Sequence, residues 1–151
     1  MPLSEDEKRT LRVLLDEIIP PSSDGRMPGA GQIGVAERLA GEMEQRPDGL
    51  AGLQAGLATL DRAARGECGS AFAELAREDR KRILAGVPEA APALVPGLLF
   101  PTWVAYYEHP RVLAALGREP RPPHPGGYEL EAFDDRLLDG VRRRARLYRE
   151  C

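Results

Sequence analysis

The sequence is poor in the residues that build metal centres and disulfide frameworks. Its 151 residues include two cysteines, Cys68 and Cys151, two histidines, His109 and His124, and no CxxC motif. Two cysteines cannot form a zinc site of their own. A disulfide between them is not expected, because the last residue of a chain frays readily. A chain of this length buries roughly 70% of the surface that its unfolded form exposes, so it can hold a core without such staples.

Long apolar runs and an excess of positive charge are also missing. No apolar run approaches the roughly 20 residues that span a bilayer, so we expect no direct membrane insertion. The first ten residues, MPLSEDEKRT, lack the basic and apolar regions of a signal peptide. The default expectation is therefore the cytoplasm, with the periplasm only for a trimmed or co-exported form. The net charge of −3 gives no overall attraction to nucleic acid.

Aromatic residues make up only 5% of the chain, and no stretch alternates apolar and polar residues as a strand would. The core must then come mainly from Leu, Ala, Val and Ile. The pattern predicts an all-α fold, a single-domain helical bundle of about six to seven helices over residues 1–151. A proline- and glycine-rich arm at 118–130 is expected to precede the last helix.

The first predicted helix has a clear start and stop. Ser4 and Glu7 fit a capping box, in which each side chain bonds the backbone of the other residue. Pro20 and Pro21 end the helix. Between them, one apolar face recurs at helical spacing: Leu11, Leu14, Leu15, Ile18 and Ile19.

The later helices follow from similar patterns. A second helix carries Ile33 to Met43 in its apolar pattern and ends before Pro47, and a third carries leucines until the stretch RGECGS, 65–70, breaks it. A fourth element spans the apolar residues between Phe72 and Val87. A short helix at 110–116 is closed by Gly117. The last helix is expected over about 134–149.

Residues 92–109 form the most apolar segment of the chain. Apolar side chains fall on several faces, which predicts a central helix packed on all sides. Pro96 fits the first turn of that helix. Pro101 would lie inside it and should kink or break it.

This segment runs into the stretch TWVAYYEHPRVLAALG, 102–117, where Glu108 and His109 follow two tyrosines. An acid and a base at these positions would suit proton transfer. However, adjacent helical residues point about 100° apart, and Pro110 pushes His109 out of helical geometry. We interpret the stretch as a helix end and exit turn, with no catalytic residue. A binding pocket near Tyr107 and His109 is the alternative.

Four further motifs have interpretations that require no catalytic chemistry. His124 could join Glu108 and His109 in a metal site, but the two histidines are fifteen positions apart across a loop, so no metal site is expected. The letters GAGQIG, 29–34, follow no strand and indicate a helix start rather than a dinucleotide site. The arginines of 142–149 are interpreted as a solvated helix face or a protein-binding surface rather than a nucleic-acid site. The arm REPRPPHPGGY, 118–128, could wrap its own core or lie along a partner.

Taken in order, these motifs resemble the gluconate 2-dehydrogenase subunit 3 family. The matching stretches are LSEDEKRTLRVLLDEIIPP, GAGQIGVAERL, GLQAGLATLDRAARGECGSAFAELAREDRKRIL, YYEHPRVLAALG and a proline- and glycine-rich stretch ending in GGY. The resemblance implies a cofactor-free helical subunit that binds a large flavoprotein dehydrogenase of the glucose-methanol-choline type, with FAD in that partner and often a cytochrome subunit alongside. It also implies a role in the stability, maturation or export of the partner. The twin-arginine segment that many members carry is not found here.

The leading hypothesis is therefore a non-catalytic accessory subunit of a flavin-dependent sugar or polyol dehydrogenase. Aromatic residues and arginine are enriched in interfaces. On that basis the candidate partner contacts are Trp103, Tyr106, Tyr107, His109, Arg121, His124 and Tyr128. Two alternatives stay open: a freestanding small-ligand-binding protein or enzyme with a pocket near Tyr107 and His109, and a self-associating structural or regulatory protein.

Overall fold

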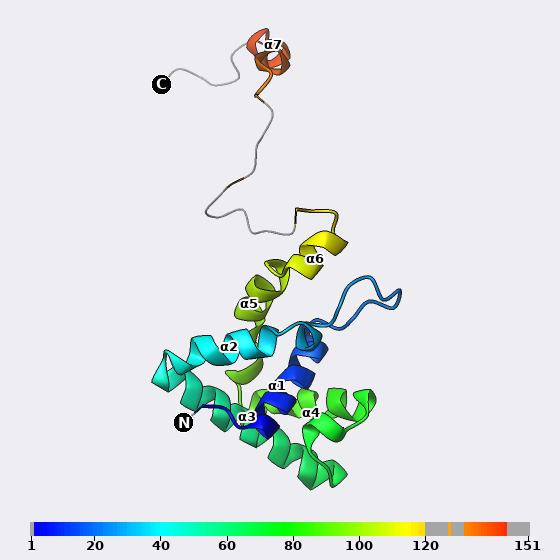
Figure 1. Cartoon of the computed structure of the whole chain (residues 1–151), viewed down its shortest axis with the longest axis vertical. Coiled ribbons are helices and arrows are strands. Elements are labelled where there is room, and N and C mark those ends of the chain that lie inside the picture. Colours follow the sequence, from blue (N-terminus) through cyan, green and yellow to red (C-terminus); the bar gives the residue numbers. More distant parts are fainter. Residues whose placement is uncertain (1, 120–126, 128–131, 145–151) are drawn as a thin grey trace. The chain divides into compact units, whose positions relative to one another are not determined.

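The structure is a computed structural model that describes residues 2–119, 127 and 132–144. The chain divides into two compact units, Met1–Arg121 and Pro122–Cys151. Within the described residues every regular element is helical, with seven α-helices and three short 3₁₀-helices (Figure 1). This confirms the all-α prediction, and the helical bundle corresponds to the first unit. A single domain over 1–151 stays a prediction.

Helix α1 (Glu5–Ile18) forms as the sequence predicted. The Glu7 backbone N–H donates to Ser4 Oγ at 3.3 Å, and the Ser4 backbone N–H donates to Glu7 Oε2 at 2.7 Å. These two bonds satisfy backbone donors that a helix start otherwise leaves free. One face of α1 enters the core, where Leu11, Leu14 and Leu15 are fully buried.

The chain then folds back onto α1 through the 3₁₀-helix η1 (Ala30–Gln32). The Gly31 N–H donates to Asp16 Oδ1 at 2.8 Å, and the Ala30 N–H donates to the Ile19 carbonyl at 3.0 Å. A Cβ on Gly31 would overlap the Arg12 carbonyl oxygen, so glycine is required for this close approach. The GAGQIG letters therefore encode a tight contact and the start of the next helix.

Helices α2 (Val35–Glu44) and α3 (Pro47–Cys68) pack against α1 and against each other. Gly34 precedes α2 with a φ of +77°, a conformation that suits glycine. Helix α3 continues through residues 65–68, so the predicted break within RGECGS occurs only at Gly69, whose φ is +75°. Glycine at that position lets the chain leave the helix in the left-handed conformation.

The next elements are η2 (Phe72–Glu74) and α4 (Arg77–Ala90). Asp61 on α3 accepts a hydrogen bond from the Phe72 N–H at 2.9 Å, which holds η2 against α3. On α4, Arg80 Nε lies 2.7 Å from Glu17 Oε1 of α1. The Glu17 side chain is only 7% exposed, so this ion pair is partly shielded from water and links α4 to α1.

Helix α5 (Leu94–Tyr107) follows and packs against α2 and α3. It has Pro96 in its first turn, as predicted, and it remains helical through Pro101 rather than breaking there. The short helix α6 (Pro110–Ala115) ends as the sequence indicated. Gly117 has a φ of +68°, and the Arg118 N–H donates to the Leu113 carbonyl at 2.8 Å. This is the Schellman arrangement that glycine permits.

The prediction that α5 packs on all sides is wrong. Phe100, Trp103 and Tyr107 are 71%, 49% and 52% exposed. In the first unit, helices pack against only one side of α5. The apolar composition of the other side does not reveal whether the chain itself covers that side.

The second unit contains η3 (Asp135–Leu138) and α7 (Asp139–Arg142). The predicted continuous helix over 134–149 is wrong in its described part, because α7 ends at Arg142, and residues 145–149 lie outside the described residues. No side chain of η3 or α7 is buried, so packing does not support a longer helix here. Gly140 adds the conformational cost of glycine inside a helix.

None of the helices in the described ranges is both long enough and apolar enough to cross a membrane.

The contact between Gly31 and α1 generates a stability prediction. We expect Gly31→Ala to lower the free energy of unfolding by about 2–3 kcal/mol, because its Cβ would collide with backbone of α1. Gly41→Ala is the matched control, since a Cβ there meets nothing within 4 Å, and it should add about 0.5–1 kcal/mol. Urea unfolding followed by circular dichroism measures both. Equal stability of Gly31→Ala and the parent would contradict this packing.

Asp16 generates a pH prediction. Burial raises the pKa of its carboxyl above the ordinary 3.8, although the Gly31 N–H opposes this shift. The unfolded chain therefore ionises first, and the folded state loses stability as pH rises from about 4 toward the folded pKa. Asp16→Asn keeps an acceptor for Gly31 without the charge. Its stability relative to the parent should rise from pH 3 to pH 7 in thermal unfolding. Asp16→Ala also removes the acceptor for Gly31 and should be about 1–2 kcal/mol less stable than Asp16→Asn at both pH values.

If Asp16→Asn were as destabilised as Asp16→Ala at neutral pH, the Asp16 charge itself would be stabilising and this account would fail.

Candidate functional site

Helix α5 carries no charged residue along its whole length. Its inner side enters the core through Leu94, Leu98, Thr102, Ala105 and Tyr106, which are buried. Its outer side presents Phe100, Trp103 and Tyr107, which are exposed. Spacings of three and four residues place these three rings on one side of the helix. We call this surface the aromatic face.

Tyr106 fixes the inner side of α5. Its side chain is 1% exposed, and its hydroxyl donates to the Pro28 carbonyl oxygen at 2.7 Å. Burial raises the pKa of this hydroxyl, so it stays protonated and remains a donor. The rings of Tyr106 and Tyr107 also form a T-shaped pair, with 5.2 Å between their centroids. The prediction that Tyr106 contacts a partner is therefore wrong, because the core of the protein encloses this side chain.

The polar residues at the end of α5 take part in the exit turn. Glu108 Oε2 lies 2.8 Å from Arg38 Nη1, and the same arginine also pairs with Glu42 at 3.0 Å. His109 has the extended backbone that precedes proline, and its Nδ1 accepts from the Arg111 N–H at 3.2 Å. Glu108 and His109 therefore serve an ion pair and a helix cap rather than converging on a substrate. This confirms their interpretation as a helix exit.

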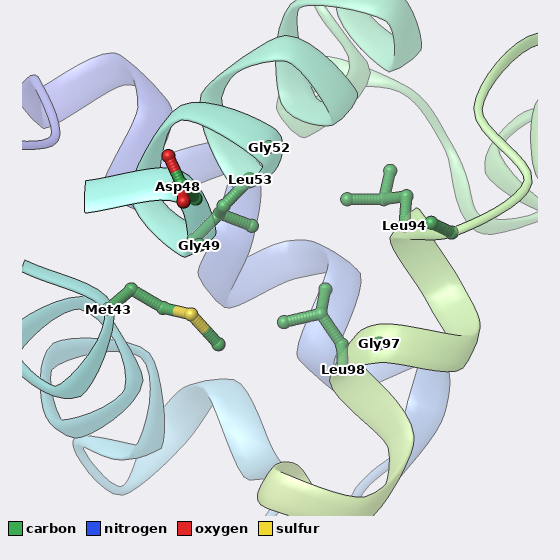
Figure 2. Close-up of a pocket in the computed structure, with 9 residues that line it drawn as sticks. Met43, Asp48, Gly49, Gly52, Leu53, Leu94, Gly97 and Leu98 are labelled. Atoms are coloured by element: carbon green, nitrogen blue, oxygen red, sulfur yellow. The ribbon is translucent and has the colours of Figure 1, made fainter. Parts of the chain in front are cut away.

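A pocket lies at the other end of α5, and the sequence analysis did not predict it. It has a volume of about 240 Å³ and opens between the end of α2, the start of α3 and the start of α5. In Figure 2 the side chains of Met43, Leu53 and Leu98 point toward its centre. The full lining comprises Met43, Asp48, Gly49, Gly52, Leu53, Ala93, Leu94, Gly97 and Leu98. Neither Tyr107 nor His109 contributes to it.

The sequence held little signal for this pocket. Gly49 and Gly52 are spaced to lie on one side of α3, beside the apolar Leu53. Glycines are common in this chain, so their spacing alone did not distinguish a pocket from an ordinary helix surface.

Three of the predicted partner contacts, Arg121, His124 and Tyr128, lie outside the described residues. The metal site considered for Glu108, His109 and His124 is not tested, because His124 lies outside the described residues. Among the residues that the structure does describe, no group of three or more His, Cys, Asp or Glu side chains could hold a metal ion.

The described part of the chain thus defines a small all-α protein whose central helix is uncharged and half-exposed. A model of the family described as gluconate 2-dehydrogenase subunit 3 matches residues 5–116. The match spans most of the chain, and the protein belongs to this family. Searches of curated proteins and of solved structures found no match.

The family match begins at the first residue of α1 and ends at the residue that caps α6. It therefore covers the helical bundle of the first unit. The family description refers to a subunit, which implies partner subunits in a dehydrogenase complex. The aromatic face and the pocket both lie within the matched residues.

The Tyr106 hydrogen bond generates a third prediction. Tyr106→Phe should lower the free energy of unfolding by about 1–2 kcal/mol, because it leaves the Pro28 carbonyl without its donor. Tyr107→Phe removes the same group from an exposed ring and should change stability by less than about 0.5 kcal/mol. Chemical unfolding of both variants measures the difference. Equal effects would show that the buried bond does not fix α5.

Proposed function

We propose that this protein is a non-catalytic accessory subunit of a flavin-dependent dehydrogenase. It binds a large flavoprotein subunit of the glucose-methanol-choline type that oxidises a sugar or polyol, and it stabilises or matures that subunit. FAD belongs to the partner in this proposal, and a cytochrome subunit is the third component. The aromatic face of α5 is the docking surface.

One observation carries this proposal: an uncharged helix exposes three large aromatic side chains on one side. A helix that is apolar on all sides is normally buried on all sides. Covering a side chain of this size is worth about 1.5–3 kcal/mol. A partner that covers the aromatic face would therefore gain a substantial part of its binding free energy there.

The surroundings of this face also suit an interface. Trp, Tyr and Phe are the residues enriched in interface cores, whereas charged residues are kept to the rim. Here Trp103 lies between Phe100 and Tyr107 in the sequence, and the charges begin only at Glu108, which pairs with Arg38. An apolar centre with charges at its border is the arrangement that interface cores favour.

The polar residues near this face support a binding role over a catalytic one. Glu108 is paired with Arg38, and His109 caps α6. Neither is left as a free acid or base beside a pocket, as a general acid–base mechanism would need. The same aromatic face would also suit self-association, so the test has to separate a flavoprotein from a second copy.

The test is affinity purification of the tagged full chain from its native organism, with mass spectrometry and a visible absorption spectrum of the eluate. We expect a stoichiometric flavoprotein with bound FAD. Phe100→Asp should reduce the flavin recovered per tagged chain at least tenfold, because it places a charge in the apolar centre of the interface. Phe133→Asp is the matched control, since Phe133 is similarly exposed, at 66% against 71% for Phe100, but belongs to the second unit.

A colourless eluate containing only the tagged chain would overturn the proposal. If that chain were also a stable homodimer that Phe100→Asp dissociates, the aromatic face would be a self-association surface instead.

A further inference from the structure

The pocket beside α5 has walls from three helices. Met43 comes from the end of α2, Leu53 from α3, and Leu94 and Leu98 from α5 (Figure 2). Asp48 is the only charged residue in the lining, and it is exposed. The interior therefore has no set of converging hydrogen-bonding side chains. Such a pocket favours an apolar group over a polar metabolite.

Glycines keep this pocket open. A Cβ added at Gly52 or at Gly97 would meet no atom within 4 Å, and one at Gly49 would lie 3.1 Å from Met43 Sδ. Gly52 and Gly97 both lie inside helices, where alanine is the more favourable residue. The walls at these two positions have room for side chains that the sequence does not provide.

The pocket adjoins the aromatic face. Gly97 lines the pocket and precedes Phe100 by three residues on α5, so the two positions are neighbours on the helix surface. Pro96 and Gly97 are themselves exposed, and no charged residue of α5 separates the pocket from Phe100. A partner that covers Phe100 would reach the mouth of the pocket.

The size of the pocket fits one side chain. An apolar cavity of about 150 Å³ takes up benzene, so a volume of about 240 Å³ can accept a Leu, Met or Phe side chain. A free ligand of that size would gain binding free energy only from burying one small apolar group, which raises affinity roughly tenfold to a hundredfold. A side chain on a docked subunit adds the same free energy to the binding free energy of the whole interface. Pockets of this kind usually receive such anchoring side chains within a larger interface.

We infer that this pocket is the anchor site of the interface and receives one apolar side chain, Leu, Met or Phe, from the flavoprotein subunit. The inference rests on the proposed function and adds to it a second point of attachment, on α2 and α3 as well as α5. The occupant is a residue of the partner, held between Met43, Leu53 and Leu98 while the aromatic face is covered.

The test fills the pocket without disturbing the fold. Gly52→Leu and Gly97→Leu place a side chain in the open space, and Gly66→Leu is the matched control on α3, exposed and with nothing within 4 Å of its added Cβ. Each full-length variant is purified from the native organism as before, and its thermal unfolding is measured. We expect all three to unfold at or above the parent temperature, since leucine replaces glycine inside a helix.

With the fold intact, the two pocket variants should recover roughly tenfold to a hundredfold less FAD-containing subunit than the parent, and Gly66→Leu should match the parent. A photo-crosslinking residue at Asp48, on the rim, should join the chain to the flavoprotein. Crosslinks to a second copy of this chain would overturn the inference.

The outcomes also separate this inference from the proposed function. If the pocket variants recovered parent levels of flavin while Phe100→Asp lost it, the anchor site would be wrong and the docking face would stand. If the parent chain itself recovered no flavoprotein, both would be wrong. A drop in flavin that Gly66→Leu shares would also count against the anchor site, because the effect would not come from the pocket.

Discussion

Helix α5 has fourteen residues without a charge, and the core of the first unit covers only one side of it. The proposed docking surface depends on this imbalance. The inner side of α5 supplies Leu98, Ala105 and Tyr106 to the core, so the helix cannot be displaced without losing that burial. The outer side leaves Phe100, Trp103 and Tyr107 in water, at a free-energy cost that a docked protein surface would remove.

The position of this face is set by contacts far away in the sequence. Tyr106 bonds to the carbonyl of Pro28, and the turn after Pro28 is held against α1 by the bond from Gly31 to Asp16. Helix α5 is thus connected to α1 through a turn that only glycine can form so closely. The family match includes all of these residues, from α1 to the end of α6.

Much of the bundle could be predicted from the sequence, because burial on one face leaves a helical period. Helix α1 and the Gly117 cap formed as expected for this reason. For α5 the helical period of apolar residues was uninformative, because a helix with apolar residues on all sides shows no pattern that distinguishes its buried side. The helix predicted at 134–149 was overextended, because an apolar stripe supports a helix only when something packs on it. The pocket was missed because it depends on side chains that Gly52 and Gly97 lack.

The most direct measurement is hydroxyl-radical footprinting of the purified chain, alone and in complex with the proposed flavoprotein partner. Trp103 is the only tryptophan in the chain, so its oxidation can be followed on a unique peptide by mass spectrometry. The account predicts rapid oxidation of Phe100, Trp103 and Tyr107 in the free chain and a fall of at least fivefold in the complex, as expected when half-exposed rings enter an interface core. Unchanged oxidation of all three rings in a flavin-containing complex would contradict it, because the partner would then bind elsewhere.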